Sequence, residues 1–236
     1  MTIGIISAME SEHRRLTGLL TSARPVTCGP LPGIEGVLGA HTLVLTRCGI
    51  GKVNAALGAT ELIRRYRPGC VISTGVAGGI DPQLRVGDVV VGRQVVHHDV
   101  WCGEGCAWGQ VQGLPLYFEG DGRLLHLALS LNGEEHGGGG LIRAGLICTG
   151  DRFITDPAEL TAIKARFPQG LAVDMESAAL AQVCHVYATP FLSFRIISDT
   201  PGIEGHLEQY ADFWGEMADR SFATTRAFLS ALRLTP

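Results

Sequence analysis

Runs of apolar residues alternate along this chain with segments of helical periodicity, and this alternation is the feature that most limits its fold. The apolar, β-rich runs lie at residues 2–8, 42–48, 70–75, 88–96, 141–148, 171–174 and 190–197. Helical patterns occupy residues 10–22, 51–66, 121–131, 156–166, 175–187 and 208–234. Strands that alternate with helices predict an α/β sandwich, and runs that are apolar throughout predict strands buried on both faces.

The chain length and the absence of a linker-like stretch predict one domain over residues 1–236. The formal net charge is −4 and Lys and Arg form no basic stripe, so we expect no nucleic-acid partner. No apolar run approaches the about 20 residues that span a bilayer, and the N-terminus lacks the basic start of a signal peptide. We therefore expect a soluble, cytoplasmic protein with no membrane partner.

Several side chains that could bind a metal lie close together in one aperiodic stretch. They are His97, His98, Asp99, Cys102 and Cys106. Zinc sites usually need a second pair of ligands downstream, which this sequence does not provide, so we interpret the group as part of a polar loop. The wider segment 98–120 is rich in Gly, Trp and Cys, and long loops of this kind are commonly functional. The glycines at 137–140 predict a flexible connector.

Three carboxylates follow apolar runs, at points where an α/β sheet presents groups to a ligand. Glu12 lies just inside the first predicted helix, Glu176 lies at a strand-to-helix boundary, and Asp199 follows the strand that contains Arg195. Taken alone, an acid in a first helical turn is often a partner of the helix dipole, and Asp174 fits strand-end polarity or a helix cap. Gathered in one crevice, three acids suit cleavage of a glycosidic bond: one protonates the leaving group, one activates water and one holds the sugar.

Six motifs extend this interpretation beyond single residues. They are GIISAMESE, CGIGKVNAALGAT, STGVAGG, GDRFI, VDMESAALAQVC and FRIISD, in that order. Together they closely resemble the nucleoside phosphorylase superfamily, and within it the nucleosidases that act on 5′-methylthioadenosine and S-adenosylhomocysteine. The resemblance runs from residue 3 to about residue 230. It implies a three-layer αβα sandwich around a central mixed, largely parallel sheet.

The resemblance also implies a role for each residue of the site. The general base for the attacking water falls on Glu12, the group that binds the ribose hydroxyls on Glu176, and the purine acid on Asp199. Arg195 would help to hold the water and Glu12, and Phe153 would stack on the base. The remaining substrate-binding residues would be Met9, Ile50, Val76, Ala77, Gly78, Ile154, Met175, Ser198 and Tyr210.

Such a site would hydrolyse the N-glycosidic bond of an adenine nucleoside and release adenine and a 5-thio-substituted ribose. Adenine departs poorly as an anion, so N7 must gain a proton as the C1′–N9 bond breaks. The chemistry calls for no metal and no organic cofactor. The resemblance implies a homodimer in which the segment 98–120 reaches toward the active site of the partner, and a charged content of 18% permits such an interface.

Other functions of the same fold stay open at this point. A futalosine or aminofutalosine hydrolase would differ in the 5′ pocket, which the segment 98–112, with Trp101 or Trp108, is expected to shape. A nucleoside phosphorylase is disfavoured, because Val76 stands where the family commonly has a serine that can touch the nucleophile, and Glu12 would repel phosphate. A non-enzymatic regulatory module that binds nucleosides would be expected to lack one of the three acids, and all three are present.

Overall fold

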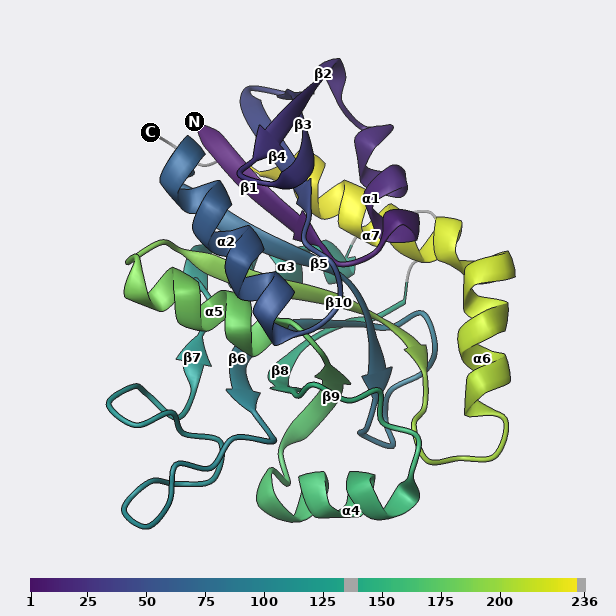
Figure 1. Ribbon diagram of the computed structural model, residues 1–236. Helices are drawn as coiled ribbons and strands as arrows, with labels where there is room; N and C mark the ends of the chain where they lie inside the picture. The colour runs from purple at the N-terminus through teal and green to yellow at the C-terminus, as the bar shows by residue number, and fades with distance from the viewer. Residues whose placement is uncertain (134–139, 233–236) are drawn as a thin grey trace.

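The computed structural model describes residues 1–133 and 140–232 (Figure 1). Its strands are β1 (Thr2–Ser7), β2 (Thr21–Cys28), β3 (Leu31–Leu38), β4 (His41–Arg47), β5 (Cys70–Gly79), β6 (Val89–His97), β7 (Phe118–Glu119), β8 (Ile142–Thr149), β9 (Gly170–Asp174) and β10 (Phe191–Asp199). Its α-helices are α1 (Glu10–Thr17), α2 (Lys52–Tyr66), α3 (Gly122–Ser130), α4 (Pro157–Arg166), α5 (Ser177–Val186), α6 (His206–Asp212) and α7 (Ala218–Ala231). Residues 137–139 of the predicted connector and 233–234 of the last predicted helix lie outside the described ranges.

The strands form one mixed sheet in the order β10-β6-β8-β9-β5-β1-β4-β3-β2, with β7 beside β6. Strand β10 also pairs with β5, so β5, β9, β8, β6 and β10 close into a ring. Among the described strands, five pairings are parallel and five are antiparallel. The α/β fold and the mixed sheet are as predicted. The largely parallel, layer-like sheet is not, because half of the pairings are antiparallel and part of the sheet closes on itself.

Helices cover the sheet from two sides (Figure 1). Helices α2 and α5 pack against each other and against β1, β4, β6 and β8. Helix α7 contacts both α1 and α3, and these three helices lie against β4, β6, β8 and β10. Alternate residues of β1 enter different cores: Ile6 packs in the core that holds Leu62 of α2, and Ile5 in the core that holds Phe222 of α7. This alternation is the period of two that a strand buried on both faces requires.

Two predicted helices end differently in the structure. The pattern at 10–22 is helical only to Thr17, after which the chain turns into β2. The pattern at 208–234 is divided by a π-helical turn, Phe213–Met217, which separates α6 from α7. π-Turns are frequently found close to functional sites, and α6 carries a residue of the pocket described below.

The parallel pairing of β1, β5 and β10 brings the carboxyl ends of these strands to one edge of the sheet. Strand β9 ends at the same place, because Val173 lies opposite Gly78 of β5. This edge is where an α/β sheet presents groups to a ligand. None of the helices in the described part of the chain is long and apolar enough to cross a membrane.

Candidate active site

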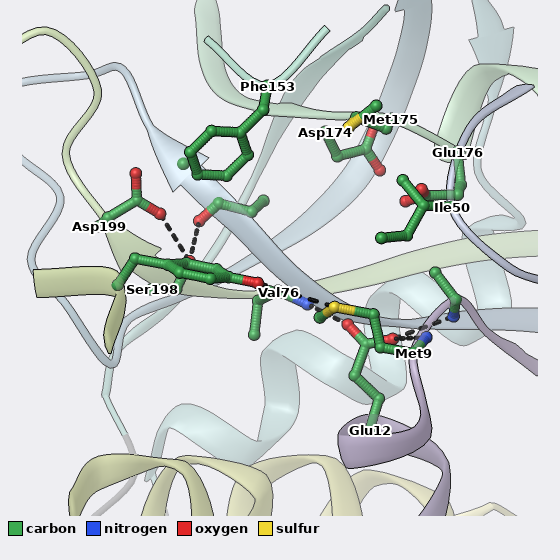
Figure 2. Close-up of a pocket in the computed structure, with 14 residues that line it drawn as sticks. Met9, Glu12, Ile50, Val76, Phe153, Asp174, Met175, Glu176, Ser198 and Asp199 are labelled. Atoms are coloured by element: carbon green, nitrogen blue, oxygen red, sulfur yellow. Dashed lines mark hydrogen bonds between the residues drawn. The ribbon is translucent and has the colours of Figure 1, made fainter. Parts of the chain in front are cut away.

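A pocket with about 470 Å³ of empty space opens at this edge of the sheet (Figure 2). It is lined by Ala8, Met9, Glu12, Ile50, Val76, Ala77, Gly78, Phe153, Asp174, Met175, Glu176, Ser198, Asp199 and Tyr210. Of the residues predicted for the site, all but two line this pocket. Ile154 lines a smaller cavity that shares Phe153 and Asp199 with it, and Arg195 lies behind Glu176. Ala8 and Asp174 also line the pocket and were not predicted to bind substrate.

Glu12 is held at the floor of the pocket by backbone amides. One oxygen, Oε2, accepts hydrogen bonds from the amides of Ala8 and Met9, both at 2.9 Å, and Oε1 accepts one from Val76 at 3.1 Å. The turn from β1 into α1 sets the first two contacts, because Glu12 reaches back over the start of its own helix. Gly75 makes room for the carboxylate, since a Cβ atom there would lie 2.5 Å from Oε1.

Burial raises the pKa of Glu12, while the amides and the positive charge of Arg195 lower it. A raised pKa makes the Glu12 carboxylate a stronger base than an exposed glutamate, which suits a general base. The side chain of Val76 brings no hydroxyl to this part of the pocket, and its amide is already bonded to Glu12.

Glu176 lies across the pocket from Asp199, between β9 and the first turn of α5 (Figure 2). Its Oε1 accepts a hydrogen bond from the amide of Gly51 at 3.0 Å, and its Oε2 lies 3.8 Å from Nη2 of Arg195. Gly51 has a φ of +96°, a conformation in which most other residues are strained. Burial, and then the negative charge of Asp174, raise the pKa of Glu176 to about 7, while Arg195 lowers it.

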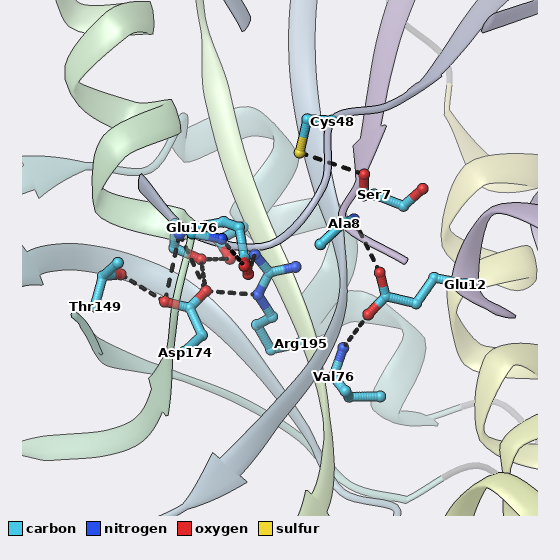
Figure 3. Close-up of polar contacts among 12 residues, drawn as sticks. Ser7, Ala8, Glu12, Cys48, Val76, Thr149, Asp174, Glu176 and Arg195 are labelled. Atoms are coloured by element: carbon cyan, nitrogen blue, oxygen red, sulfur yellow. Dashed lines mark hydrogen bonds and ion pairs between the residues drawn. The ribbon is translucent and has the colours of Figure 1, made fainter. Parts of the chain in front are cut away.

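Arg195 is buried and finds the acidic partners that a buried arginine needs (Figure 3). Its Nε donates to Oδ2 of Asp174 at 2.8 Å. Asp174 also accepts a hydrogen bond from the amide of Ser177 at 3.1 Å, as expected for a group that caps a helix. Arg195 is predicted to help hold Glu12. In the structure the ion pairs of Arg195 run to Asp174 and Glu176, and Arg195 acts on Glu12 through its positive charge, which lowers the pKa of Glu12.

Asp199 closes the opposite end of the pocket. It follows a register shift between Ile197 and Asp199 in the pairing of β10 with β5, and its Oδ1 accepts a hydrogen bond from the hydroxyl of Ser198 at 2.7 Å. Burial raises the pKa of Asp199, so its carboxyl is protonated more readily than that of an exposed aspartate. Phe153 lies over this end and contacts Tyr210 edge to face, with ring centroids 5.4 Å apart. An exposed aromatic face beside a carboxylic acid suits a flat heteroaromatic ring.

The predicted pocket-shaping role of the loop after β6 is not fulfilled within one chain. Among the described residues, none from 98–120 lines the pocket. Trp101 stacks on Trp108 with centroids 6.1 Å apart, and the guanidinium of Arg166 lies 3.7 Å from the Trp108 ring centre. The loop is tied to the first residue of α2 through Asp99, which pairs with Nζ of Lys52 at 2.7 Å. The possible metal ligands of this loop do not gather: no group of three or more His, Cys, Asp and Glu that could hold a metal occurs in the described ranges.

Comparison with known proteins agrees with this geometry. A family model described as the phosphorylase superfamily matches residues 2–230. The 5′-methylthioadenosine/S-adenosylhomocysteine nucleosidase of Tolumonas auensis is 42% identical over 205 residues, which cover 86% of this chain and 88% of that protein. The nucleosidase of the same name from Neisseria meningitidis, solved with methylthio-immucillin-A, has a TM-score of 0.91 and 38% identity, covering 98% of this chain and 99% of the other. That from Colwellia psychrerythraea, solved with adenine, has a TM-score of 0.92 and 35% identity, covering 98% and 96%.

Proposed function

We propose, since this chain belongs to the phosphorylase superfamily, that it hydrolyses the N-glycosidic bond of 5′-methylthioadenosine and S-adenosylhomocysteine. The products are adenine and a 5-thio-substituted ribose. The observation that carries the proposal is that three buried carboxylates, Glu12, Glu176 and Asp199, line one pocket from different strand ends. The similar nucleosidases, two of them solved with methylthio-immucillin-A or with adenine, support the choice of substrate.

Asp199 acts on the base. Burial raises its pKa and so favours the protonated carboxyl, which donates its proton toward N7 so that adenine leaves as a neutral molecule. Phe153 stacks on the ring, and the hydroxyl of Ser198 keeps the carboxyl in place. The backbone beside Phe153, including that of Ile154, is proposed to read the edge of the base.

Glu12 and Glu176 act on the ribose side. As the glycosidic bond breaks, the sugar gains oxocarbenium character, which nearby carboxylates stabilise. Glu176 binds the ribose hydroxyls, with Met175 and Met9 packing on the sugar. Glu12 orients the attacking water and accepts its proton. Because Val76 offers no hydroxyl for a phosphate and Glu12 would repel one, water is the nucleophile.

One experiment tests this function. The protein is incubated with 5′-methylthioadenosine, S-adenosylhomocysteine, adenosine and aminofutalosine, with and without phosphate, and the released base is measured. We expect release of adenine from the first two compounds without phosphate, together with free 5-substituted ribose. Strict dependence on phosphate, or a ribose 1-phosphate product, would assign a phosphorylase instead. Preference for aminofutalosine would assign a different 5′ group.

Glu12→Gln should lower kcat by about 10² while the protein still binds a nucleoside, because the amide keeps the shape of the side chain but cannot accept the proton of the water. The measurement is steady-state hydrolysis of 5′-methylthioadenosine alongside calorimetric binding of the nucleoside. Glu35→Gln is the matched control, since Glu35 pairs with Arg24 on the surface and lies outside the pocket. A Glu12→Gln variant that turned over normally, or that lost binding but kept turnover, would contradict the role assigned to Glu12.

We also propose that the chain acts as a single unit, 1–236, within a homodimer, in the cytoplasm. Exposed apolar side chains support an interface near the pocket. Ile50 lies just before α2, Val53 and Leu57 lie on the first turns of α2, and Trp101 lies on the loop that Lys52 anchors. Monomeric proteins rarely leave such surface uncovered. The partner's segment 98–120 would then complete the 5′ end of the pocket.

Val53→Glu should weaken this dimer, because the side chain of Val53 is 80% exposed in a single chain and a charge there would be buried at the interface. Light scattering at micromolar concentration should show a dimer for the unaltered protein and a larger monomer fraction, with lower activity, for the variant. Leu141→Glu, at an exposed apolar position just before β8, is the control. A fully active monomer at micromolar concentration would rule the dimer out.

A further inference from the structure

Asp174 accepts more hydrogen bonds than a helix cap requires, and its side chain is only 1% exposed. Oδ1 accepts a hydrogen bond from the hydroxyl of Thr149 at 2.5 Å. Oδ2 accepts hydrogen bonds from the amide and hydroxyl of Ser177 and from Nε of Arg195. The three donor residues lie at the end of β8, the start of α5 and the middle of β10. A single carboxylate at the edge of the pocket therefore joins three elements (Figure 3).

Two of these elements, the start of α5 and the middle of β10, determine the position and surroundings of the Glu176 carboxylate. Ser177 is the next residue, so its two bonds to Asp174 fix the turn that presents the Glu176 carboxylate. Arg195 lies between the two acids, with Nε on Asp174 at 2.8 Å and Nη2 at 3.8 Å from Glu176. A guanidinium can grip a carboxylate with two parallel hydrogen bonds. Nε is held by Asp174, and Nη2 lies beyond hydrogen-bond distance of Glu176, so the arginine does not make that full pair with Glu176.

We propose that Asp174 is a positioning residue for the hydrolysis, because it holds Arg195 and the first turn of α5 so that Glu176 stays available to the ribose hydroxyls. The ribose role of Glu176 in this inference rests on the function proposed above. Asp174 acts through its neighbours, since both of its oxygens are already engaged by protein donors. The helix-cap interpretation of Asp174 thus describes only one of its bonds.

The charges around Glu176 give this role a second, independent readout. The titratable and charged groups that face Glu176 come from five elements. They are Asp174 on β9, Arg195 on β10, Glu12 on α1, the thiol of Cys48 after β4 and the hydroxyl of Tyr210 on α6. Asp174 is the largest of the charged influences that raise the pKa of Glu176 to about 7. Replacing Asp174 with a neutral residue should therefore lower that pKa and extend the ionised range of Glu176 to lower pH.

Asp174→Asn tests the inference. We expect kcat/KM for 5′-methylthioadenosine to fall on the order of 10²-fold, because a misplaced substrate-positioning group costs about that much. The acid limb of the pH profile should move to lower pH. Carbon-13 NMR of labelled glutamate, assigned with Glu176→Gln, should show the Glu176 pKa below its value in the unaltered protein. Adenine affinity, measured by calorimetry, should change less than about twofold, since Asp199 binds the base from the other end of the pocket.

Asp121→Asn is the matched control, because Asp121 caps α3 through the amides of Arg123 and Leu124 and lies outside the pocket. An unchanged kcat/KM, an unshifted Glu176 pKa, or an equal loss of adenine binding in Asp174→Asn would overturn the inference. If Asp174→Asn does not fold, Ser177→Ala serves as the second variant, because it removes the hydroxyl that donates to Asp174. We expect kcat/KM to fall several-fold while the affinity for adenine is unchanged. An unaltered kcat/KM in Ser177→Ala would overturn the inference. If the unaltered protein releases no adenine, the proposed function fails, while the Glu176 titration still tests the role of Asp174.

Discussion

Asp199→Asn should lower kcat for 5′-methylthioadenosine by about 10²–10⁴ while the fold survives. The amide keeps the shape of the side chain but has no acidic proton to give to N7, and a general acid typically contributes a factor of this size. Ser198 can still donate its hydroxyl to the amide oxygen, so the end of β10 should keep its conformation. The measurement is steady-state release of adenine, with circular dichroism and thermal unfolding as checks on the fold.

Asp156→Asn provides the matched control for this variant. Asp156 caps α4 by accepting a hydrogen bond from the amide of Ala158 at 2.8 Å, and it does not line the pocket. The same chemical change there should leave kcat within about twofold. A normal kcat in Asp199→Asn would mean that Asp199 serves the structure only, and that the proton reaches the base by another route.

The parts of the fold that could be predicted are those in which burial dictates the residue type. The pattern predicts a strand at 88–96, and β6 lies at Val89–His97, because its two runs of buried hydrophobic residues, 89–91 and 95–96, are valines. The hairpin of β2 and β3 was missed, because most side chains of β2 are exposed and give no apolar run. The ring closure could not be predicted either, since it depends on β10 pairing with β5 as well as with β6.

In the candidate site, the side chains could be predicted from the sequence and the backbone donors could not. Motifs identified most of the side chains that line the pocket, because a carboxylate or an aromatic ring is visible in the sequence. The backbone donors were not identifiable. The amide of Gly51 bonds Glu176, and the amides of Ala8, Met9 and Val76 bond Glu12, so these contacts depend on how the turns after β1 and β4 meet strand β5 and the start of α5. Asp174 was underestimated for a related reason, since a helix cap accounts for an acid at that position without any reference to Arg195.

Selectivity for the base should be large: kcat/KM for inosine should be lower than that for 5′-methylthioadenosine by about 10⁴ or more. In the proposed complex Asp199 donates a proton to N7 and accepts a hydrogen bond from the 6-amino group. A 6-oxopurine places an acceptor where the site expects a donor, so a buried polar group loses its partner. Sites built around such hydrogen bonds reject the wrong substrate by factors of this order.

The 5′ end of the pocket should be permissive by comparison, and this contrast makes the test sharper. Met9 and Ile50 are apolar, and a methylene in an apolar pocket changes the activation free energy by only about 1–3 kcal/mol. Adenosine is therefore the control, since it differs from inosine only at the base and from 5′-methylthioadenosine only at the 5′ group. We expect adenosine to be cleaved much faster than inosine. Comparable kcat/KM values for inosine and adenosine would show that Asp199 does not read the 6-amino group, and the proposed class of substrate would fall with it.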